Sequence, residues 1–185
     1  MEKVHELITT RWSPRAFNQK PVEYDKLHLL FEAAKWAPSG RNAQPWRFIY
    51  ATKDMKEYEL LYGLLNEGNK KWASSAPLLV LTLAQTISTY KNRPNRLASF
   101  EAGMAVSNLL IQATYMGLFA HQMGGYDSEK AKEVLVIPTR YEPMSMMAIG
   151  YKDGTEKVSK EDEFWEKRDR TRMEISKFLV SGKCK

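Results

Sequence analysis

Apolar residues repeat with helical spacing in two segments near the start of the chain. Between Glu23 and Trp36 they recur at i, i+3, i+4 and i+7, which predicts an amphipathic helix. Pro38-Ser39-Gly40 follows and predicts the end of that helix. A shorter pattern over residues 4–8 predicts a first helix that ends before Ser13-Pro14.

Runs of apolar residues predict the strands. Leu78–Leu83 is apolar almost throughout, with a β-branched residue at its centre, which predicts a buried strand. Further strands are predicted at 47–52, 118–122, 144–151 and 177–180. Helices are predicted over 54–66 and over 129–135, the latter capped by Asp127 or Ser128, and residues 85–96 are predicted to be an exposed connection. This irregular alternation predicts an α+β fold.

The most hydrophobic stretch of the chain is Leu97–Gly117. Residues 102–120 approach the length that a bilayer-spanning helix needs. Asn108 and Gln112 lie one turn apart near its centre, and no basic cluster flanks it, which argues against a membrane span. An all-round apolar helix is typical of a core or an interface, so a long buried helix is favoured.

Length and composition indicate one ordinary globular domain over 1–185, with a charged C-terminal arm from residue 155. The net charge of +6 is spread along the chain among acidic residues, which disfavours nucleic-acid binding but suits anionic small ligands. The only cysteine, Cys184, cannot form an internal disulfide. The first residues lack the apolar run of a signal peptide, so we expect a cytoplasmic protein.

Standard catalytic and nucleotide motifs are missing from the sequence. There is no G-x-G-x-x-G, Walker loop, G-x-S-x-G or H-E-x-x-H pattern. His5, His28 and His121 have no metal-ligand spacing, so no metal site is expected. His121 lies before two glycines and could line a site, although a structural role is favoured for it. The shortage of acid–base candidates favours chemistry that is carried by a cofactor.

Two arginine-bearing patches lie at opposite ends of the chain. They are Arg11-Trp12-Ser13-Pro14-Arg15 and Arg170-Thr171-Arg172, and Ala37–Trp46 with its Ser, Asn and Gln residues lies between them. Guanidinium groups bind phosphate, and the polar side chains of the middle segment can bond the edge of a heterocycle. The same arginines could instead form surface ion pairs or a solvated helix face. Taken together, the three segments favour a phosphorylated cofactor.

In this order, the motifs resemble the FMN-dependent nitroreductase family over nearly the whole chain. They are Arg11-x-Ser13-x-Arg15-x-Phe17, Ala37-Pro38-Ser39-Gly40-x-Asn42-x-Gln44-Pro45-Trp46, Asn69, Asn108-Leu109-Leu110, Met123-Gly124-Gly125-Tyr126-Asp127 and Arg170-Thr171-Arg172. The resemblance implies a homodimer with a mixed or antiparallel sheet flanked by helices, a long helix at the dimer interface, and FMN in a cleft between the subunits.

The resemblance also assigns the cofactor-binding residues. They are Arg11, Trp12, Ser13, Arg15, Pro38, Ser39, Gly40, Asn42, Gln44, Asn69, Gly124, Gly125, Arg170 and Arg172. Arg170 and Arg172 would hold the phosphate, and Arg15 would border the pyrimidine edge of the ring. The partner subunit would supply Ser39 and its neighbours. Many relatives have an acidic residue where this chain has Gly124, so that role is unfilled here.

The activity implied is hydride transfer from NADH or NADPH, through flavin N5, to a nitroaromatic, quinone or similar small acceptor by a ping-pong mechanism. The flavin would carry the chemistry, with no catalytic side chain. Two alternatives stay open. One is another flavin reaction on the same scaffold, such as reductive dehalogenation or flavin-dependent oxidation. The other is a non-catalytic basic protein that binds nucleic acid or a membrane surface.

Overall fold

The computed structural model describes residues 3–153 and 159–183, so Cys184 and residues 155–158 of the predicted tail lie outside the described residues. The helices are α1 (Glu6–Thr10), α2 (Tyr24–Lys35), η1 (Gly40–Asn42), α3 (Glu57–Leu64), α4 (Glu67–Ala73), α5 (Ala98–Tyr115), α6 (Ser128–Val134), α7 (Lys160–Lys167) and η3 (Ile175–Lys177). The strands are β1 (Trp46–Thr52), β2 (Leu78–Gln85), β3 (Phe119–Met123) and β4 (Tyr141–Gly150).

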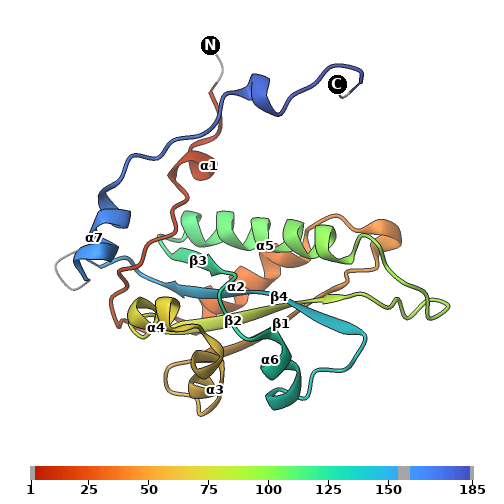
Figure 1. Cartoon of the computed structure of the whole chain (residues 1–185), viewed down its shortest axis with the longest axis horizontal. Coiled ribbons are helices and arrows are strands. Elements are labelled where there is room, and N and C mark those ends of the chain that lie inside the picture. Colours follow the sequence, from red (N-terminus) through yellow and green to blue (C-terminus); the bar gives the residue numbers. More distant parts are fainter. Residues whose placement is uncertain (1–2, 154–158, 184–185) are drawn as a thin grey trace.

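The four strands form one antiparallel sheet in the order β1-β2-β4-β3 (Figure 1). Every residue of the central strand β2 is buried, because helices cover both faces of the sheet. This explains why its sequence is apolar throughout rather than alternating. The α+β prediction with a sheet flanked by helices is confirmed, and the sheet is antiparallel.

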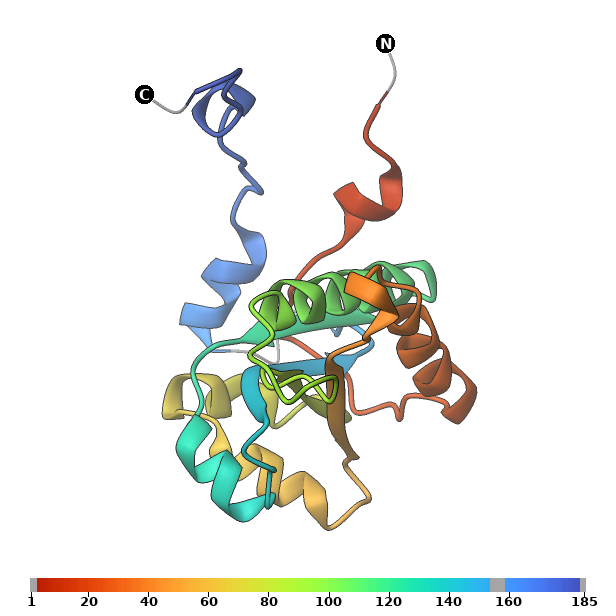
Figure 2. The same ribbon diagram turned by 90° about the vertical axis from the view of Figure 1, so that its right-hand side faces the viewer.

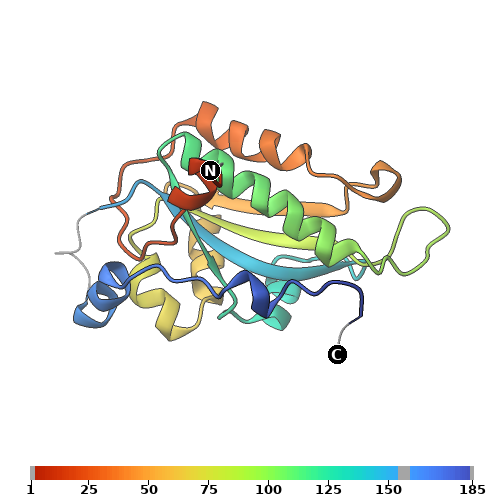
Figure 3. The same cartoon turned by 90° about the horizontal axis from the view of Figure 1, so that it is seen from above.

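Helices divide the core into two layers, one on each face of the sheet. On one face, α2 and α5 lie side by side and pack on Leu78, Val80 and the matching residues of β4 (Figure 3). On the other face, α3, α4 and α6 pack on Leu79 and Leu81, the residues in between. Successive side chains of a strand point to opposite faces, so one run of β2 supplies both layers.

Helix α5 buries only one of its faces within the chain. Ala102, Ala105 and Leu109 pack inward, whereas Phe100 is 66% exposed and Tyr115 is 71% exposed. The prediction of a long buried helix therefore holds only for the face that packs inward. Among the described residues, no helix combines the length and the hydrophobicity that a membrane span requires.

Both chain ends leave this body and extend away from it on the side of α5 (Figure 2). Helix α1 buries none of its residues. Apolar residues of these two arms are exposed, among them Val4, Ile8 and Met173. The apolar pattern predicts α1 correctly, but no part of the described chain buries the apolar residues of this helix.

The structure differs from the predicted elements at several places, and helix α7 and the short helix η1 were not predicted. The strand predicted over 177–180 is wrong, because the amide groups of Phe178 and Leu179 donate to the Ile175 carbonyl at 3.1 and 2.9 Å and form η3. The helix predicted over 54–66 ends at Leu64. There the chain becomes extended, and the Asn66 side chain accepts the Asn69 N–H at 2.9 Å, which starts the unpredicted helix α4.

Candidate functional site

The arginine-bearing segments from the two ends of the chain meet in one pocket of about 280 Å³. The segment after α1 and the segment that follows α7 both line the pocket, and they approach each other where Arg170 bonds the carbonyls of Thr9 and Arg11. Six residues of the predicted site line it, namely Arg11, Trp12, Ser13, Arg15, Arg170 and Arg172. His121, on β3, lines it as well.

Five arginines line this pocket together with the acids Glu166 and Asp169; the arginines are Arg11, Arg15, Arg168, Arg170 and Arg172. Burial lowers the pKa of Arg11, and the positive charges of Arg170 and Arg172 lower it further. Arg170 is held in place because its Nη1 and Nη2 donate to the carbonyls of Thr9 and Arg11 at 2.5 and 2.7 Å. Like charges that are held together repel, so an anion between them is stabilised. A phosphate, with several acceptor oxygens, matches such a cluster.

Trp12 adds a donor to the pocket. Its indole Nε1–H is buried and has no hydrogen-bond partner among the described residues. The Arg170 guanidinium lies 5.2 Å from the centre of the Trp12 ring, and Arg11 Nη1 donates to Ser13 Oγ at 3.0 Å. A buried donor without a partner costs about 1–3 kcal/mol, which a ligand oxygen could recover. The pocket therefore fits a phosphate-bearing molecule.

Arg15 is engaged by α7. Its Nη1 donates to Asp162 Oδ1 at 2.8 Å, and its backbone N–H donates to the Glu166 carboxylate. The guanidinium also lies 5.2 Å from the ring centre of Trp165. Asp162 is only 5% exposed, so these contacts dock α7 against the N-terminal segment. Sequence analysis missed Asp162 and Glu166, although two acids at i and i+4 on one helix face are a usable signal.

His121 packs the N-terminal segment against β3. Its Nδ1 donates to the Pro14 carbonyl at 2.9 Å, and its ring centre lies 4.4 Å from that of Trp72. Burial lowers the pKa of His121, the bond to Pro14 raises it in part, and the Arg15 charge lowers it. The ring is therefore neutral near pH 7 and has a structural role, as the sequence favoured.

Acidification should destabilise the protein through His121. A pKa that is lower in the folded chain means that the unfolded chain binds more protons below about pH 6.5, so stability falls as the pH decreases from there toward the folded pKa. His121→Gln should flatten this dependence in urea midpoints measured at about pH 7.5 and about pH 5.5. His28→Gln, on the exposed side of α2, is the control and should keep the wild-type slope. A wild-type slope in His121→Gln would contradict this role.

The glycine turn follows β3 directly, about 10 Å along the strand from His121. The Gly125 carbonyl accepts Asn69 Nδ2 and the Asn66 backbone N–H, both at 3.0 Å. A Cβ at Gly125 would lie 2.3 Å from Asn66 Nδ2, whereas a Cβ at Gly124 would meet nothing within 4 Å. The structure therefore brings Asn69, Gly124 and Gly125 together. The protein itself requires the glycine at 125, and the open side of the turn is at Gly124.

The middle segment forms a strained turn at η1. Arg41, Asn42 and Gln44 all have positive φ, at 53°, 55° and 47°. Such non-glycine conformations cost about 1–3 kcal/mol each and persist only where the surroundings hold them. Here Glu101 of α5, which is 4% exposed, accepts the Gly40 N–H at 2.7 Å through Oε1. Sequence analysis missed this role of Glu101.

The residues predicted for one site thus lie in three groups within the chain. Pro38, Ser39, Gly40, Asn42 and Gln44 do not line the arginine pocket.

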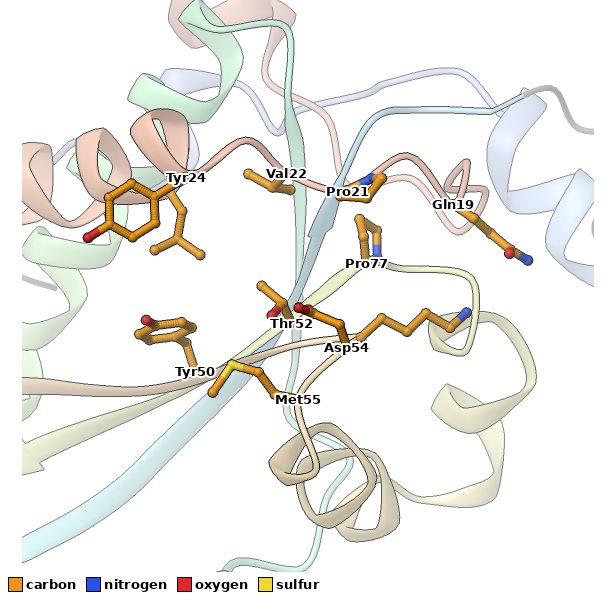
Figure 4. Close-up of a pocket in the computed structure, with 11 residues that line it drawn as sticks. Gln19, Pro21, Val22, Tyr24, Tyr50, Thr52, Asp54, Met55 and Pro77 are labelled. Atoms are coloured by element: carbon orange, nitrogen blue, oxygen red, sulfur yellow. The ribbon is translucent and has the colours of Figure 1, made fainter.

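A further cavity of about 620 Å³ lies between the start of α2 and the end of β1 (Figure 4). Tyr24, Tyr50 and Asp54 line it, and it contains no predicted site residue.

Comparison with known proteins gives consistent relatives. The model of the nitroreductase family matches residues 8–71 and 55–151. A protein of Streptococcus pyogenes serotype M6, provisionally named NAD(P)H nitroreductase, is 27% identical over 184 residues, which cover 82% of this chain and 90% of the relative.

Solved structures share the fold. A crystal structure of an oxidoreductase containing FMN superposes with a TM-score of 0.93 at 34% identity and covers 98% of this chain and 93% of its own. A provisionally named nitroreductase from Desulfovibrio desulfuricans, in complex with FMN, has a TM-score of 0.75 at 22% identity and covers 97% and 96%. Since the family model matches well over half of the sequence, the chain belongs to the nitroreductase family.

Proposed function

We propose that this protein is an FMN-dependent oxidoreductase that takes hydride from NADH or NADPH and passes it to a nitroaromatic, a quinone or a similar acceptor. The observation that carries the proposal is the convergence of Arg11, Arg170, Arg172 and the unpartnered Trp12 N–H in one pocket. The choice of FMN is supported by the 34% identical structure, which contains it.

The arginine pocket would hold the phosphate end of FMN. Strand β3 leads from His121 in that pocket to the glycine turn, so the ring would lie along it toward the open side of Gly124. There the backbone can approach closely because no side chain intervenes. Asn69 would hold the turn through its bond to the Gly125 carbonyl. When bound, FMN supplies the two-electron chemistry, and the chain binds and orients the reactants.

The chain's own titratable groups fit this division of work. His121 is partly buried, its pKa is lowered by burial, and its Nδ1 is bonded to Pro14, so we expect it not to act as a general acid. The Arg15 guanidinium would place a positive charge near the ring, partly offset by its ion pair with Asp162. Donor and acceptor would then use one open site in turn, and double-reciprocal plots at several acceptor concentrations should be parallel.

A homodimer would bring the three groups of residues into one site. The exposed apolar face of α5 and the exposed apolar residues of both arms favour a twofold interface there. In such a dimer, the η1 turn of one chain would complete the pocket of the other. Light scattering on the FMN-bound protein should give the mass of a dimer. A stable monomer that still binds FMN would exclude this arrangement.

The absorption spectrum of the purified or reconstituted protein tests the cofactor. We expect visible flavin bands, and heat should release FMN rather than FAD. NADH or NADPH alone should bleach these bands in the absence of oxygen. A colourless protein that takes up no FMN on reconstitution would refute the proposal.

Arg172→Ala should weaken FMN binding. The loss of a charge-assisted contact costs about 1.5–3 kcal/mol, which corresponds to an increase in Kd of about 10- to 150-fold. Titration of the apoprotein with FMN measures it. Lys177→Ala removes a cation from the same arm outside the pocket and should leave the Kd unchanged. Equal effects of the two substitutions would mean that Arg172 acts only through net charge.

A further inference from the structure

A cavity of about 640 Å³ lies between the η1 turn and the connection from β2 to α5. Gly40 and Arg41 of the turn line one side of it, and Tyr90 and Arg93 of the connection line the other. Glu101 at the start of α5 lines it as well. The cavity thus shares the turn that the proposed function assigns to the flavin site, but none of its lining residues belongs to the arginine pocket.

Positive charge surrounds this cavity. The connection 86–97 contains Lys91, Arg93 and Arg96 and no acidic residue. Within 3–153 and 159–183, neither these three cations nor Arg41 forms a salt bridge with a carboxylate. All four side chains are exposed, in contrast to Arg15, which Asp162 neutralises. Unpaired cations around a concave surface concentrate anions.

Tyr90 organises two of these cations. The Arg41 guanidinium carbon lies 5.7 Å from the centre of the Tyr90 ring, and Lys91 Nζ lies 5.1 Å from it. Cation–π contacts of this kind hold both groups near one point without neutralising them. Arg41 also has a fixed backbone, because its positive φ lies in the turn that Glu101 holds. The cationic side of the cavity is therefore partly pre-formed.

Glu101 is the one carboxylate that lines the cavity among the described residues, and its single negative charge is outnumbered by the four cations. Its Oε1 is bonded to the Gly40 N–H at 2.7 Å, and its Oε2 is buried without a hydrogen-bond partner in the described chain. A buried acceptor of this kind can receive an amide or hydroxyl donor that a ligand brings. The cavity therefore offers several exposed cations and one recessed acceptor.

We propose that this cavity binds an anionic group, a phosphate or a carboxylate, of a substrate that reacts at the neighbouring flavin, with Arg41 and Arg93 as the residues that recognise it. The proposal rests on the proposed function for the identity of that substrate. The anionic group could belong to the nicotinamide donor, through its phosphates, or to an acidic acceptor. Both share one chemistry, and matched substrates separate them.

The variant Arg41→Ala/Arg93→Ala tests the site by steady-state kinetics. For the donor, NADH is compared with reduced nicotinamide riboside, which has no phosphate. For the acceptor, 4-nitrobenzoate is compared with the uncharged 4-nitrobenzyl alcohol. We expect the KM of the anionic member of one pair to increase about tenfold or more, with its uncharged partner unaffected. The pair that responds identifies the source of the anion. Arg140→Ala, a nearby arginine outside the cavity, is the control and should change neither pair.

Direct binding separates failure of this site from failure of the proposed function. Calorimetric titration of the protein with pyrophosphate and with 4-nitrobenzoate should show binding of at least one anion that Arg41→Ala/Arg93→Ala weakens about tenfold and Arg140→Ala leaves intact. If the wild-type protein holds no flavin, the proposed function fails while this titration still decides the anion site. If both substrate pairs and both titrations are unchanged in the double variant, the site is refuted.

Discussion

Gly125→Ala should destabilise the fold by about 2–4 kcal/mol. The new Cβ would lie 2.3 Å from Asn66 Nδ2 and 2.9 Å from Asn69 Nδ2. Neither side chain can move freely, because Asn66 caps α4 and Asn69 donates to the Gly125 carbonyl. Overpacking typically costs about 1–3 kcal/mol, and the loss of a helix cap adds about 1 kcal/mol. For a chain of this size, the melting temperature should fall by roughly 5–15 °C.

Gly124→Ala is the matched control, because a Cβ there meets nothing within 4 Å of the protein. Its melting temperature should stay within about 2 °C of the wild type. If FMN lies against the open side of Gly124, this variant should instead weaken FMN binding. Equal melting temperatures for the two alanine variants would show that the turn relaxes and that the packing at Gly125 is not tight.

Arg15→Ala should release α7 from the body of the protein. The substitution leaves Asp162, whose side chain is 7% exposed, without its cation. Breaking a buried ion pair costs about 3–5 kcal/mol, and the lower limit applies here because Arg15 itself is 27% exposed. The undocked population should rise about 150-fold at 3 kcal/mol. Limited trypsin digestion should therefore cut after Lys160 and Lys167 much faster than in the wild type.

Two further variants separate the ion pair from a general loss of charge. Lys35→Ala removes a cation whose side chain is 55% exposed and whose partner Glu32 is 48% exposed, so it should have a small effect. Arg15→Ala/Asp162→Asn should recover part of the protection, because the uncompensated buried charge is gone. If the double variant is cut as fast as Arg15→Ala, the Arg15 side chain holds α7 through Trp165 instead.

The regular elements of the core could be predicted from the sequence, because their buried residues recur at the fixed spacings of a helix or a strand. Strand β2 and helix α2 have strong apolar patterns, and the structure places both in the core. Helix α4 was missed because its start depends on the cap at Asn66, and only Trp72 and Ala73 of its seven residues are buried. The false strand at 177–180 has apolar residues but no neighbouring strand in the described chain to bond its backbone.

Of the candidate site, the sequence predicted only the residues that would face the ligand. Residue chemistry and order pointed to Arg11, Arg170 and Arg172, and the fold brings them together. The buried carboxylates Asp162 and Glu101, which hold the surrounding segments in place, could not be deduced in the same way. Asp162 lies in a highly charged helix, and its burial depends on Arg15, 147 positions earlier in the chain. Glu101 acts through one hydrogen bond to Gly40, which lies 61 positions away in the sequence. No local pattern of residues around Glu101 predicts this bond.

The long sequence separation between the halves of the arginine pocket affects how the protein is made. The last strand of the sheet ends at Gly150, so the sheet can assemble during synthesis before the pocket can. Arg170 must still bond Thr9, 161 positions earlier. Such non-local contacts form slowly, because the chain first loses the entropy of a very large loop. The pocket should therefore be the last part to mature, and a ribosome-stalled chain that exposes residues only up to 150 should resist proteases in its sheet while binding no phosphate.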